Sequence, residues 1–465
     1  MYQEVLTADE VRQIHETSMR VLETVGVRMP TEEALGTFRE HGARVENDRV
    51  YLTEEQVMTA LAGVPRSFTL HARKADRSVV VGDGSAVCAP GYGAPFLVDV
   101  ETGKRSPTLA DYANLAKIAH ELPNQDVSGH LIVDPEGIPQ AHLHMLHAHL
   151  VHSDKPFMGS TAGAEGATQT LEMARIAFDE EIGERAVTIS LINSLSPLGF
   201  ADDMLDVLMV YAKARQPMII AALAMGGTTA PVSLAGLLSM QAAELLAGIV
   251  LTQLVSPGTP VVLGSTSSNV DMRVGSLTIG SPELSMLISA HAQLARFYGI
   301  PSRSGGALTD ASYPDAQAGF ESMLSLTTTM ASGIDFVLHS AGILSSYLAF
   351  SFEKFVLDDE MCGMVREMRE GFPVDPDALA YETIAAVGPG GNYLSQKHTI
   401  SRCRTEFWKP ALCDRRGLAA WVADGGRDAV DRATARWQQL LEEHEDPAMD
   451  GHVRRRLDAY LDTHI

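Results

Sequence analysis

The feature that most constrains the fold is a regular alternation of short apolar runs with amphipathic segments from residue 109 onward. Nearly all-apolar strands that alternate with helices are typical of a parallel sheet covered on both faces. Eight such units close an α/β (β/α)8 TIM barrel; the alternative is a doubly wound open sheet. No G-x-G-x-x-G follows the first strand, which argues against the dinucleotide-binding version of that alternative. Seven strands are predicted, at 127–133, 156–160, 187–192, 217–223, 260–264, 300–305 and 336–340, and residues 271–279 could provide an eighth.

The two ends of the chain depart from this pattern, so we expect three regions. Thr7 opens a capping box, and apolar residues follow it at helical spacing. Residues 49–100 contain short β-prone runs separated by glycines. We predict an N-terminal cap of helices and a small sheet at residues 1–105, the barrel at 106–375, and a helical C-terminal extension packed on the barrel at 376–465.

Charge and cysteine usage narrow the partners and the compartment. A net charge of −23 repels phosphate backbones, so we expect no nucleic-acid partner. The four cysteines show no C-x-x-C spacing, which is typical of a reduced, cytosolic protein. The first residues lack the apolar run of a signal peptide, and the most apolar windows are too short or too interrupted to span a bilayer. We therefore expect a cytoplasmic protein without a membrane partner, and we also expect a homo-oligomer.

Small and hydroxyl-bearing residues follow most of the predicted strands. The active site of a parallel barrel lies at the carboxyl ends of its strands, so these residues would line it. Arg303 and His339 stand out there, at the ends of neighbouring strands. Tight turns alone would explain the glycines and serines, and Arg303 and His339 could have structural roles. Six such ends on one rim favour a roomy site with neutral polar walls.

Aromatic residues gather in two places, although they make up only 6% of the chain. One group lies in a glycine-rich loop and the other follows the last predicted strand. Aromatic faces attract quaternary ammonium groups, whereas phenylalanines three residues apart, such as Phe352 and Phe355, are also typical of a helix core. The aromatic candidates for substrate binding are Tyr92, Phe96, Tyr347 and Phe350.

Five histidines lie in the predicted helix at residues 140–152, namely His142, His144, His147, His149 and His152. A zinc site usually adds a carboxylate or a thiolate to such a set. Leucines at 143, 146 and 150 form the apolar stripe of this helix, so most of the histidines are expected to point outward. We predict a solvated or intersubunit face rather than a metal site, and the spacing alone does not decide whether metal binds.

Four carboxylates lie in or beside predicted turns that follow strands, namely Asp271, Glu283, Asp310 and Asp315. Glu283 and Asp315 are located where helices begin, and pairing with the helix N-terminus is a sufficient explanation for both. Glu283 and Asp310 are candidates for positioning, and no residue is predicted to act as a catalytic acid or nucleophile. The absence of G-x-S-x-G, P-loop, H-E-x-x-H and C-x-x-C motifs leaves hydrolase, kinase and metalloprotease activities without support.

Several longer motifs occur together in this chain. They include Gly226-Gly-Thr-Thr-Ala-Pro-Val, Gln293-Leu-Ala-Arg-Phe-Tyr-Gly-Ile-Pro, Pro314-Asp-Ala-Gln-Ala, Leu338-His-Ser-Ala-Gly and Gly390-Gly-Asn-Tyr-Leu. In combination they resemble the trimethylamine methyltransferase family, specifically its members without pyrrolysine, from about residue 5 to the end. The resemblance implies a TIM barrel that passes a methyl group to the Co(I) corrinoid (cobalamin) of a small partner protein, with no tightly bound cofactor of its own.

The chemistry of methyl transfer indicates the class of substrate. The chain contains only the twenty standard residues, and a neutral trimethylamine would need activation because a dimethylamide is a very poor leaving group. A quaternary ammonium already releases a neutral tertiary amine. By analogy with related members, glycine betaine is the first choice, ahead of proline betaine, carnitine and γ-butyrobetaine. Each carries a carboxylate, for which His339 and Arg303 are the candidate partners.

Two other functions remain open at this point. One is a betaine-binding or regulatory barrel that transfers no methyl group. The other is an unrelated barrel enzyme, such as an aldolase or decarboxylase, which would need a lysine at a strand end; the predicted strand ends contain none.

Overall fold

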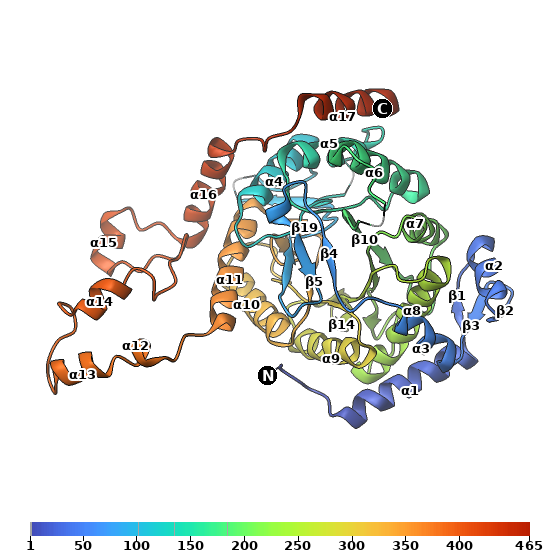
Figure 1. Ribbon diagram of the computed structural model, residues 1–465, viewed down its shortest axis with the longest axis horizontal. Helices are drawn as coiled ribbons and strands as arrows, with labels where there is room; N and C mark the ends of the chain where they lie inside the picture. The colour runs from blue at the N-terminus through green and yellow to red at the C-terminus, as the bar shows by residue number, and fades with distance from the viewer. Residues whose placement is uncertain (1, 101, 134, 184) are drawn as a thin grey trace.

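The computed structural model describes residues 2–100, 102–133, 135–183 and 185–465. At its centre lies a curled, seven-stranded parallel sheet inside a ring of helices (Figure 1). In spatial order the strands are β6 (Val87–Ala89), β17 (Phe336–Leu338), β16 (Ser302–Arg303), β13 (Val261–Ser265), β11 (Met218–Ala222), β10 (Thr188–Asn193) and β9 (Phe157–Met158).

A short segment, residues 126–128, lies between the two outer strands of this sheet. The Met158 N–H of β9 donates to the Ser128 carbonyl over 2.9 Å. On the other side, the N–H groups of Asp126 and Val127 donate to the Cys88 carbonyl of β6 over 2.8 and 3.1 Å. Both edges of the sheet are therefore bonded to one segment, which brings the edges together.

The prediction for the eighth strand was wrong. Residues 271–279 do not join the main sheet; they contribute to a separate three-stranded sheet of β12 (Met225–Gly226), β14 (Ser268–Asp271) and β15 (Ser276–Leu277). Instead β6, which we had assigned to the N-terminal cap, pairs in parallel with β17. All three residues of β6 are buried, but the run is too short for its sequence to distinguish it from a cap strand.

A ring of helices surrounds the sheet, as the alternation predicts (Figure 1). They are α4 (Leu109–Glu121), α5 (Ala141–His152), α6 (Gly163–Phe178), α7 (Asp202–Lys213), α8 (Leu234–Val255), α9 (Pro282–Tyr298), α10 (Ala316–Ala331) and α11 (Phe352–Glu370). By length and composition α8 could cross a membrane, but 83% of its most apolar window is buried inside the fold. Its apolar surface is explained by the N-terminal helices that cover its outer face.

The inside of the curled sheet is filled by side chains. Alternate residues of the strands, such as Ile189 and Ile219, meet there in one apolar cluster. The hairpin of β4 (Phe68–Leu70) and β5 (Val79–Val81) contributes Leu70 and Val81 to this cluster. The Ala186 carbonyl, just before β10, accepts from the His71 N–H, so the hairpin lies at the amino ends of the strands. The opposite, carboxyl ends are left for a site.

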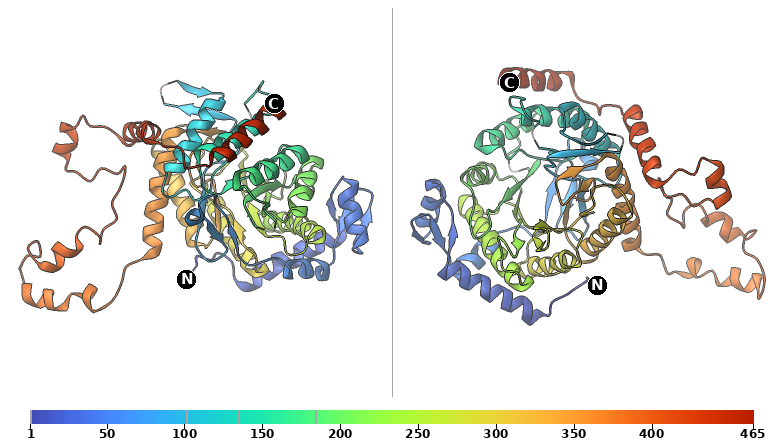
Figure 2. Two further views of the ribbon diagram at one scale, coloured as in Figure 1. Left: turned by 45° about the horizontal axis from the view of Figure 1, so that its top comes forward. Right: turned by 180° about the vertical axis from the view of Figure 1, so that it is seen from behind.

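The N-terminal segment packs on the outside of α8 (Figure 2). It consists of α1 (Ala8–Thr24), α2 (Glu32–Glu40) and α3 (Glu54–Ala62) with a small sheet of β1 (Val27–Arg28), β3 (Arg49–Tyr51) and β2 (Arg44–Glu46). The predicted capping box is confirmed, because the Thr7 side chain accepts from the Glu10 N–H and the Glu10 carboxylate accepts from the Thr7 N–H.

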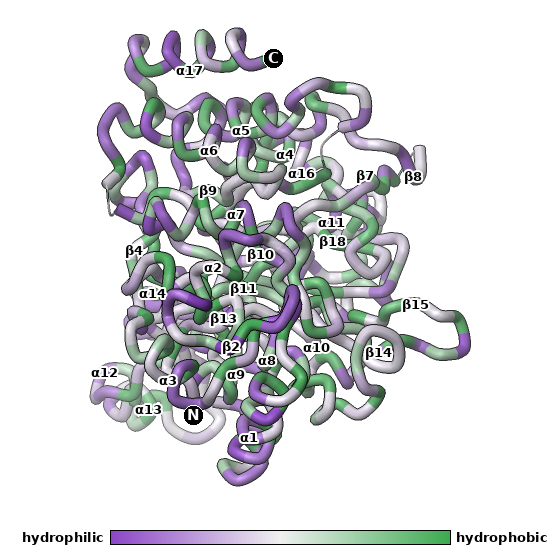
Figure 3. Tube along the Cα trace, turned by 90° about the vertical axis from the view of Figure 1, so that its right-hand side faces the viewer, coloured by the Kyte–Doolittle hydropathy of each residue, from purple (hydrophilic) through white to green (hydrophobic). Residues whose placement is uncertain are grey.

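We had expected the whole C-terminal region to pack on the barrel, but only part of it does. Residues 371–427 form an arm that extends away from the ring, on the side opposite the N-terminal segment (Figure 2). The arm carries α12 (Pro376–Leu379), α13 (Tyr381–Val387), α14 (Lys397–Arg402) and α15 (Leu418–Ala423), and none of these helices has a buried residue. The chain then returns, with α16 (Ala429–Glu443) against α11 and α17 (Gly451–His464) beside α5 and α6 (Figure 3).

Candidate functional site

Five side chains from separate segments lie together at the carboxyl ends of the main strands. Tyr92 follows β6, Arg303 ends β16, and His339 follows β17. Tyr347 lies in the turn between β18 (Ile343–Leu344) and β19 (Ala349–Phe350), and His130 follows the 126–128 segment. The ring centroids of Tyr347 and His339 are 4.8 Å apart, and those of Tyr92 and His130 are 5.7 Å apart.

His339 is held as a neutral imidazole. Its backbone has φ +66°, a left-handed conformation that turns the chain sharply away from β17. The Tyr92 N–H donates to His339 Nδ1 over 3.2 Å, so this nitrogen serves as an acceptor. Burial, followed by the charge of Arg303, lowers the pKa of His339 well below its usual value. The side chain can therefore offer a hydrogen bond from Nε2 without adding a second positive charge.

Arg303 is a buried cation without an anionic partner. Only 1% of the residue is exposed, and its Nε has no hydrogen-bond acceptor in the described chain. Among the described residues no carboxylate forms an ion pair with it. Burial lowers the pKa of Arg303 to about 10, which leaves it charged at neutral pH. A buried charge of this kind is costly to leave unpaired, so the site is suited to an anionic group.

Sequence reasoning missed His130. It fell inside a predicted strand, whereas the structure places it at φ +48° just beyond residues 126–128. Its N–H donates to the Tyr112 hydroxyl over 3.2 Å, and burial lowers its pKa to about 4. The imidazole stacked on Tyr92 is thus neutral. The preceding Gly129 was the signal that the strand ended earlier.

Tyr347 is presented by a tight turn. Ser345, Ser346 and Tyr347 all have positive φ angles, between 50° and 75°. Asp310 fastens this turn, because one carboxylate oxygen accepts from Ser346 Oγ over 2.7 Å. The same carboxylate accepts from the N–H groups of Ile279 and Gly280. These are contacts of the kind that a positioning residue makes, and they link the turn to the loop before α9.

The remaining candidates lie outside this cluster. The Phe96 ring is covered by Lys104 Nζ, 3.5 Å from its centroid, in the hairpin of β7 (Phe96–Asp99) and β8 (Gly103–Arg105). Phe350 is fully buried and packs edge-on against Phe355 at 5.1 Å, where it fills the space beside Gly342. Glu283 lies in the first turn of α9.

Apolar and neutral polar side chains are exposed beyond the carboxyl ends of β10 and β11. Leu195 beyond β10 and Leu223 beyond β11 are 56% and 41% exposed, and Asn193 is also exposed. Glu244 of α8 holds the loop after β10 through the hydroxyls of Ser194 and Ser196 and the N–H of Leu198. Exposed leucines at strand ends offer an apolar surface to a large, flat partner group.

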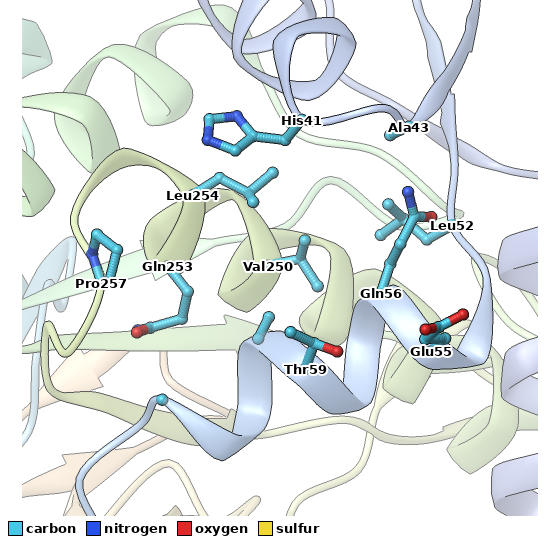
Figure 4. Close-up of a pocket in the computed structure, with 12 residues that line it drawn as sticks. His41, Ala43, Leu52, Glu55, Gln56, Thr59, Val250, Gln253, Leu254 and Pro257 are labelled. Atoms are coloured by element: carbon cyan, nitrogen blue, oxygen red, sulfur yellow. The ribbon is translucent and has the colours of Figure 1, made fainter.

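A separate hollow of about 430 Å³ lies between α3 and α8 (Figure 4). Its walls include Val250 and Leu254 near the end of α8 and Thr59 of α3. The end of α8 precedes the start of β13, so this hollow is on the amino side of the strands. It is remote from the cluster around Arg303, and we assign no role in the chemistry to it.

The prediction that the histidines of α5 point outward was wrong. None of the five is exposed; His142 and His149 are buried, and His142 Nε2 contacts Gln169 Oε1 at 2.7 Å. The C-terminal segment covers this face, with Asp458 of α17 contacting His147 at 2.7 Å. The helical pattern could not reveal a covering segment more than 300 residues further along the chain.

Comparison with known proteins gives a consistent family. The family described as "Trimethylamine methyltransferase (MTTB)" matches residues 1–464. The glycine betaine methyltransferase of Desulfitobacterium hafniense is 48% identical over 98% of this chain and 96% of its own length. The L-carnitine:corrinoid methyltransferase of Eubacterium limosum is 33% identical over 94% of this chain and 93% of its own. The trimethylamine methyltransferase of Methanosarcina thermophila is 30% identical, with coverages of 98% and 96%.

A solved structure resembles the fold. The monomethylamine methyltransferase of Methanosarcina barkeri superposes with a TM-score of 0.50, covering 93% of this chain and 92% of that one. Because the two sequences are only 15% identical, this likeness concerns the α/β fold alone.

Proposed function

Because this chain belongs to the trimethylamine methyltransferase family, we propose that it transfers a methyl group from glycine betaine to the Co(I) corrinoid of a partner protein. The relative at 48% identity is named for glycine betaine, whereas those named for carnitine and proline betaine are 33% identical. These identities support glycine betaine over the other carboxylated quaternary amines. The chain is accordingly a corrinoid-dependent methyltransferase.

The buried guanidinium of Arg303, which forms no ion pair among the described residues, is the observation that carries the choice of a betaine. A betaine carboxylate would supply the charge partner that the described chain lacks there. The Tyr92 and Tyr347 rings would lie against the ammonium, and neutral His339 would add a hydrogen bond without repelling it. Trimethylamine has no carboxylate, so in a site for trimethylamine Arg303 would remain a buried charge without an anionic partner, which costs free energy.

The reaction needs no proton donor in this site. The reduced corrinoid of the partner protein would supply the electron pair for the new bond to the methyl carbon. The C–N electron pair would stay on nitrogen, so the product is dimethylglycinate, with a neutral amine nitrogen and its carboxylate still beside Arg303. The residues of this chain hold the carboxylate, orient the ammonium and exclude water. The apolar rim at Leu195 and Leu223 is compatible with a corrin ring approaching the strand ends.

A spectroscopic assay tests this function. The protein is mixed with free Co(I) cobalamin and, separately, glycine betaine, carnitine, proline betaine, γ-butyrobetaine and trimethylamine. We expect the loss of the Co(I) absorbance to be fastest with glycine betaine and absent with trimethylamine. Calorimetric binding of glycine betaine without any absorbance change would instead support a binding or regulatory protein. The absence of both calorimetric binding and an absorbance change would overturn the proposal.

The finer description of the fold is also a proposal. We interpret the curled sheet as a (β/α)8 TIM barrel in which the 126–128 segment takes the eighth strand position. Its bonds to Met158 on one side and Cys88 on the other support this closure. The boundaries at residues 105 and 375 remain predictions, and we expect the protein to act in the cytoplasm without a cofactor bound tightly to this chain.

The arm supports assembly with a second copy of this chain. It exposes large apolar side chains, including Phe372 at 82%, Leu394 at 80% and Phe407 at 70%. Within a chain of net charge −23, residues 397–416 contain six lysines and arginines against two acidic residues. The basic segment 397–416 of this apolar arm is complementary to the acidic body of another copy.

Light scattering of the full chain and of an L394D/F407D double variant tests this assembly. We expect an oligomer that falls to a smaller mass in the variant while its circular dichroism is unchanged. A monomeric wild-type protein would contradict pairing between copies. So would a mass that rises only when the corrinoid protein is added.

A further inference from the structure

Three potential metal ligands from distant parts of the sequence converge at the amino side of the main sheet. His152 is the last residue of α5, while His444 and Asp446 lie in the linker between α16 and α17. Asp446 Oδ1 is 2.6 Å from His152 Nδ1 and 3.1 Å from His444 Nε2. One ligand atom from each residue falls within 4.8 Å of the others, so a single ion could contact all three.

The surroundings orient these ligands. His444 Nδ1 contacts Glu121 Oε1 at 2.8 Å, which leaves Nε2 directed at Asp446. A carboxylate behind a histidine is the usual support for a metal-binding imidazole, because it fixes the ring and its tautomer. The His444 side chain is 3% exposed and that of Asp446 is 47% exposed, so the site has a rigid inner wall and an open outer side.

We propose that His152, His444 and Asp446 bind a divalent transition-metal ion, with Zn²⁺ as the ion whose chemistry fits best. Two imidazole nitrogens and one carboxylate oxygen leave a fourth tetrahedral position for water. Zinc bonds of about 2.0–2.2 Å place neighbouring ligand atoms roughly 3.3 Å apart, so only small shifts are needed.

The ion would act as a clamp rather than in methyl transfer. The end of α5 leads directly to β9, so the site lies at the amino ends of the strands, away from Arg303 and His339 at the carboxyl ends. It would fasten the linker before α17 to α4 and α5, and so hold the C-terminal helix on the barrel. The proposal is therefore independent of the proposed function.

The chain offers a matched control on the same helix. His147 contacts Asp458 of α17 at 2.7 Å, a similar histidine–aspartate pair that also joins α5 to the C-terminal segment. In the described chain it belongs to no group of three ligands. His147→Gln thus removes a comparable contact and leaves the proposed site intact.

The test measures metal binding and thermal stability of the full-length protein after chelation. For the wild type and H147Q we expect one Zn²⁺ per chain by calorimetry and a rise in Tm on adding Zn²⁺. For H444Q we expect binding weakened about tenfold or more and no rise in Tm. The visible spectrum with Co²⁺ should be that of a tetrahedral site without thiolate bands, which separates it from sites at the exposed Cys403 and Cys413.

Two results would overturn the proposal: a wild-type chain that binds no Zn²⁺ or Co²⁺, or an H444Q chain that binds as the wild type does. The first would leave these side chains as a hydrogen-bonded staple only. Should H444Q fold poorly, Asp446→Asn provides a second variant at a more exposed ligand, with the same expected loss of binding and the same contradicting outcome.

Discussion

Two fully buried cations are treated in opposite ways in this molecule. Lys354, in the first turn of α11, has its Nζ 2.5 and 2.6 Å from the two carboxylate oxygens of Asp358, and a further contact with Ser322 Oγ at 2.9 Å. Arg303, at the end of β16, is equally buried, yet its Nε has no acceptor in the described part of the chain.

The difference separates a structural charge from a binding charge. Asp358 lies four residues after Lys354 on the same helix, so the partner is built in and the pair is complete in the free protein. Arg303 ends a strand on which no such neighbour is available. A buried charge that the fold leaves unpaired is expected to be retained for a ligand, at some cost in stability.

Breaking the complete pair should give the largest effect. Asp358→Ala leaves Lys354 buried without an anion, and we expect the free energy of unfolding to fall by about 3–5 kcal/mol in urea titrations. Replacing both residues, as K354M/D358L, should recover most of that loss because no charge is then buried. A loss below about 1 kcal/mol for Asp358→Ala would erase the contrast between the two cations.

The matching change at the other cation should affect activity rather than stability. Arg303→Met leaves the substrate carboxylate unpaired, which costs about 2–5 kcal/mol, or about 30- to 4000-fold in kcat/KM for glycine betaine. The free energy of unfolding should stay the same or rise. Arg296→Met provides a control, because Arg296 donates to the Ser332 carbonyl away from the site. Arg303→Met with full activity and reduced stability would make Arg303 a structural residue.

The tyrosines sharpen the comparison by isolating the other end of the substrate. Tyr92→Leu or Tyr347→Leu removes an aromatic face and should weaken binding by about 0.5–2 kcal/mol, or about 2- to 30-fold in Kd. Calorimetry should show this loss for both glycine betaine and tetramethylammonium, since both carry the ammonium. The Tyr→Phe variants keep the ring and serve as controls. A loss for glycine betaine alone would place the tyrosines at the carboxylate instead.

His149 of α5 provides a third buried group without a partner, but a neutral one. Neither ring nitrogen has a hydrogen bond within the described residues, and burial lowers its pKa to about 3. Below about pH 6.5 the unfolded chain takes up a proton that the folded chain does not, so stability falls as pH falls. His149→Met should reduce this fall between pH 7.5 and 5.5 by about 1 kcal/mol. Parallel pH profiles for the two proteins would contradict this account.

Periodicity was sufficient for the ring of helices and for most of the strands, because buried strands and amphipathic helices leave strong local patterns. It failed where the answer depended on distant parts of the chain. β6 is only three residues long, and only its pairing with β17 identifies it as part of the main sheet. The histidines of α5 were predicted to face solvent because α17, which packs over them, comes about 300 residues later in the sequence.

The sequence predicted those residues of the candidate site whose positions follow from the ends of the parallel strands. Arg303, His339 and Tyr347 come together because turns after neighbouring parallel strands must meet. The substrate-binding role of Phe96 and Phe350 stays a prediction, since an aromatic residue in a core and one facing a ligand have the same signature in sequence. His130 was missed because a left-handed turn is not visible without the backbone. None of these patterns could have revealed that Arg303 lacks a partner.

A crystal structure of the protein with glycine betaine would test the central claim most directly. The account predicts the carboxylate about 2.8 Å from the guanidinium of Arg303, with the ammonium against Tyr92 and Tyr347 and one methyl group facing the open rim. Betaine bound with its ammonium nearest Arg303, or bound away from the carboxyl ends of the strands, would contradict it.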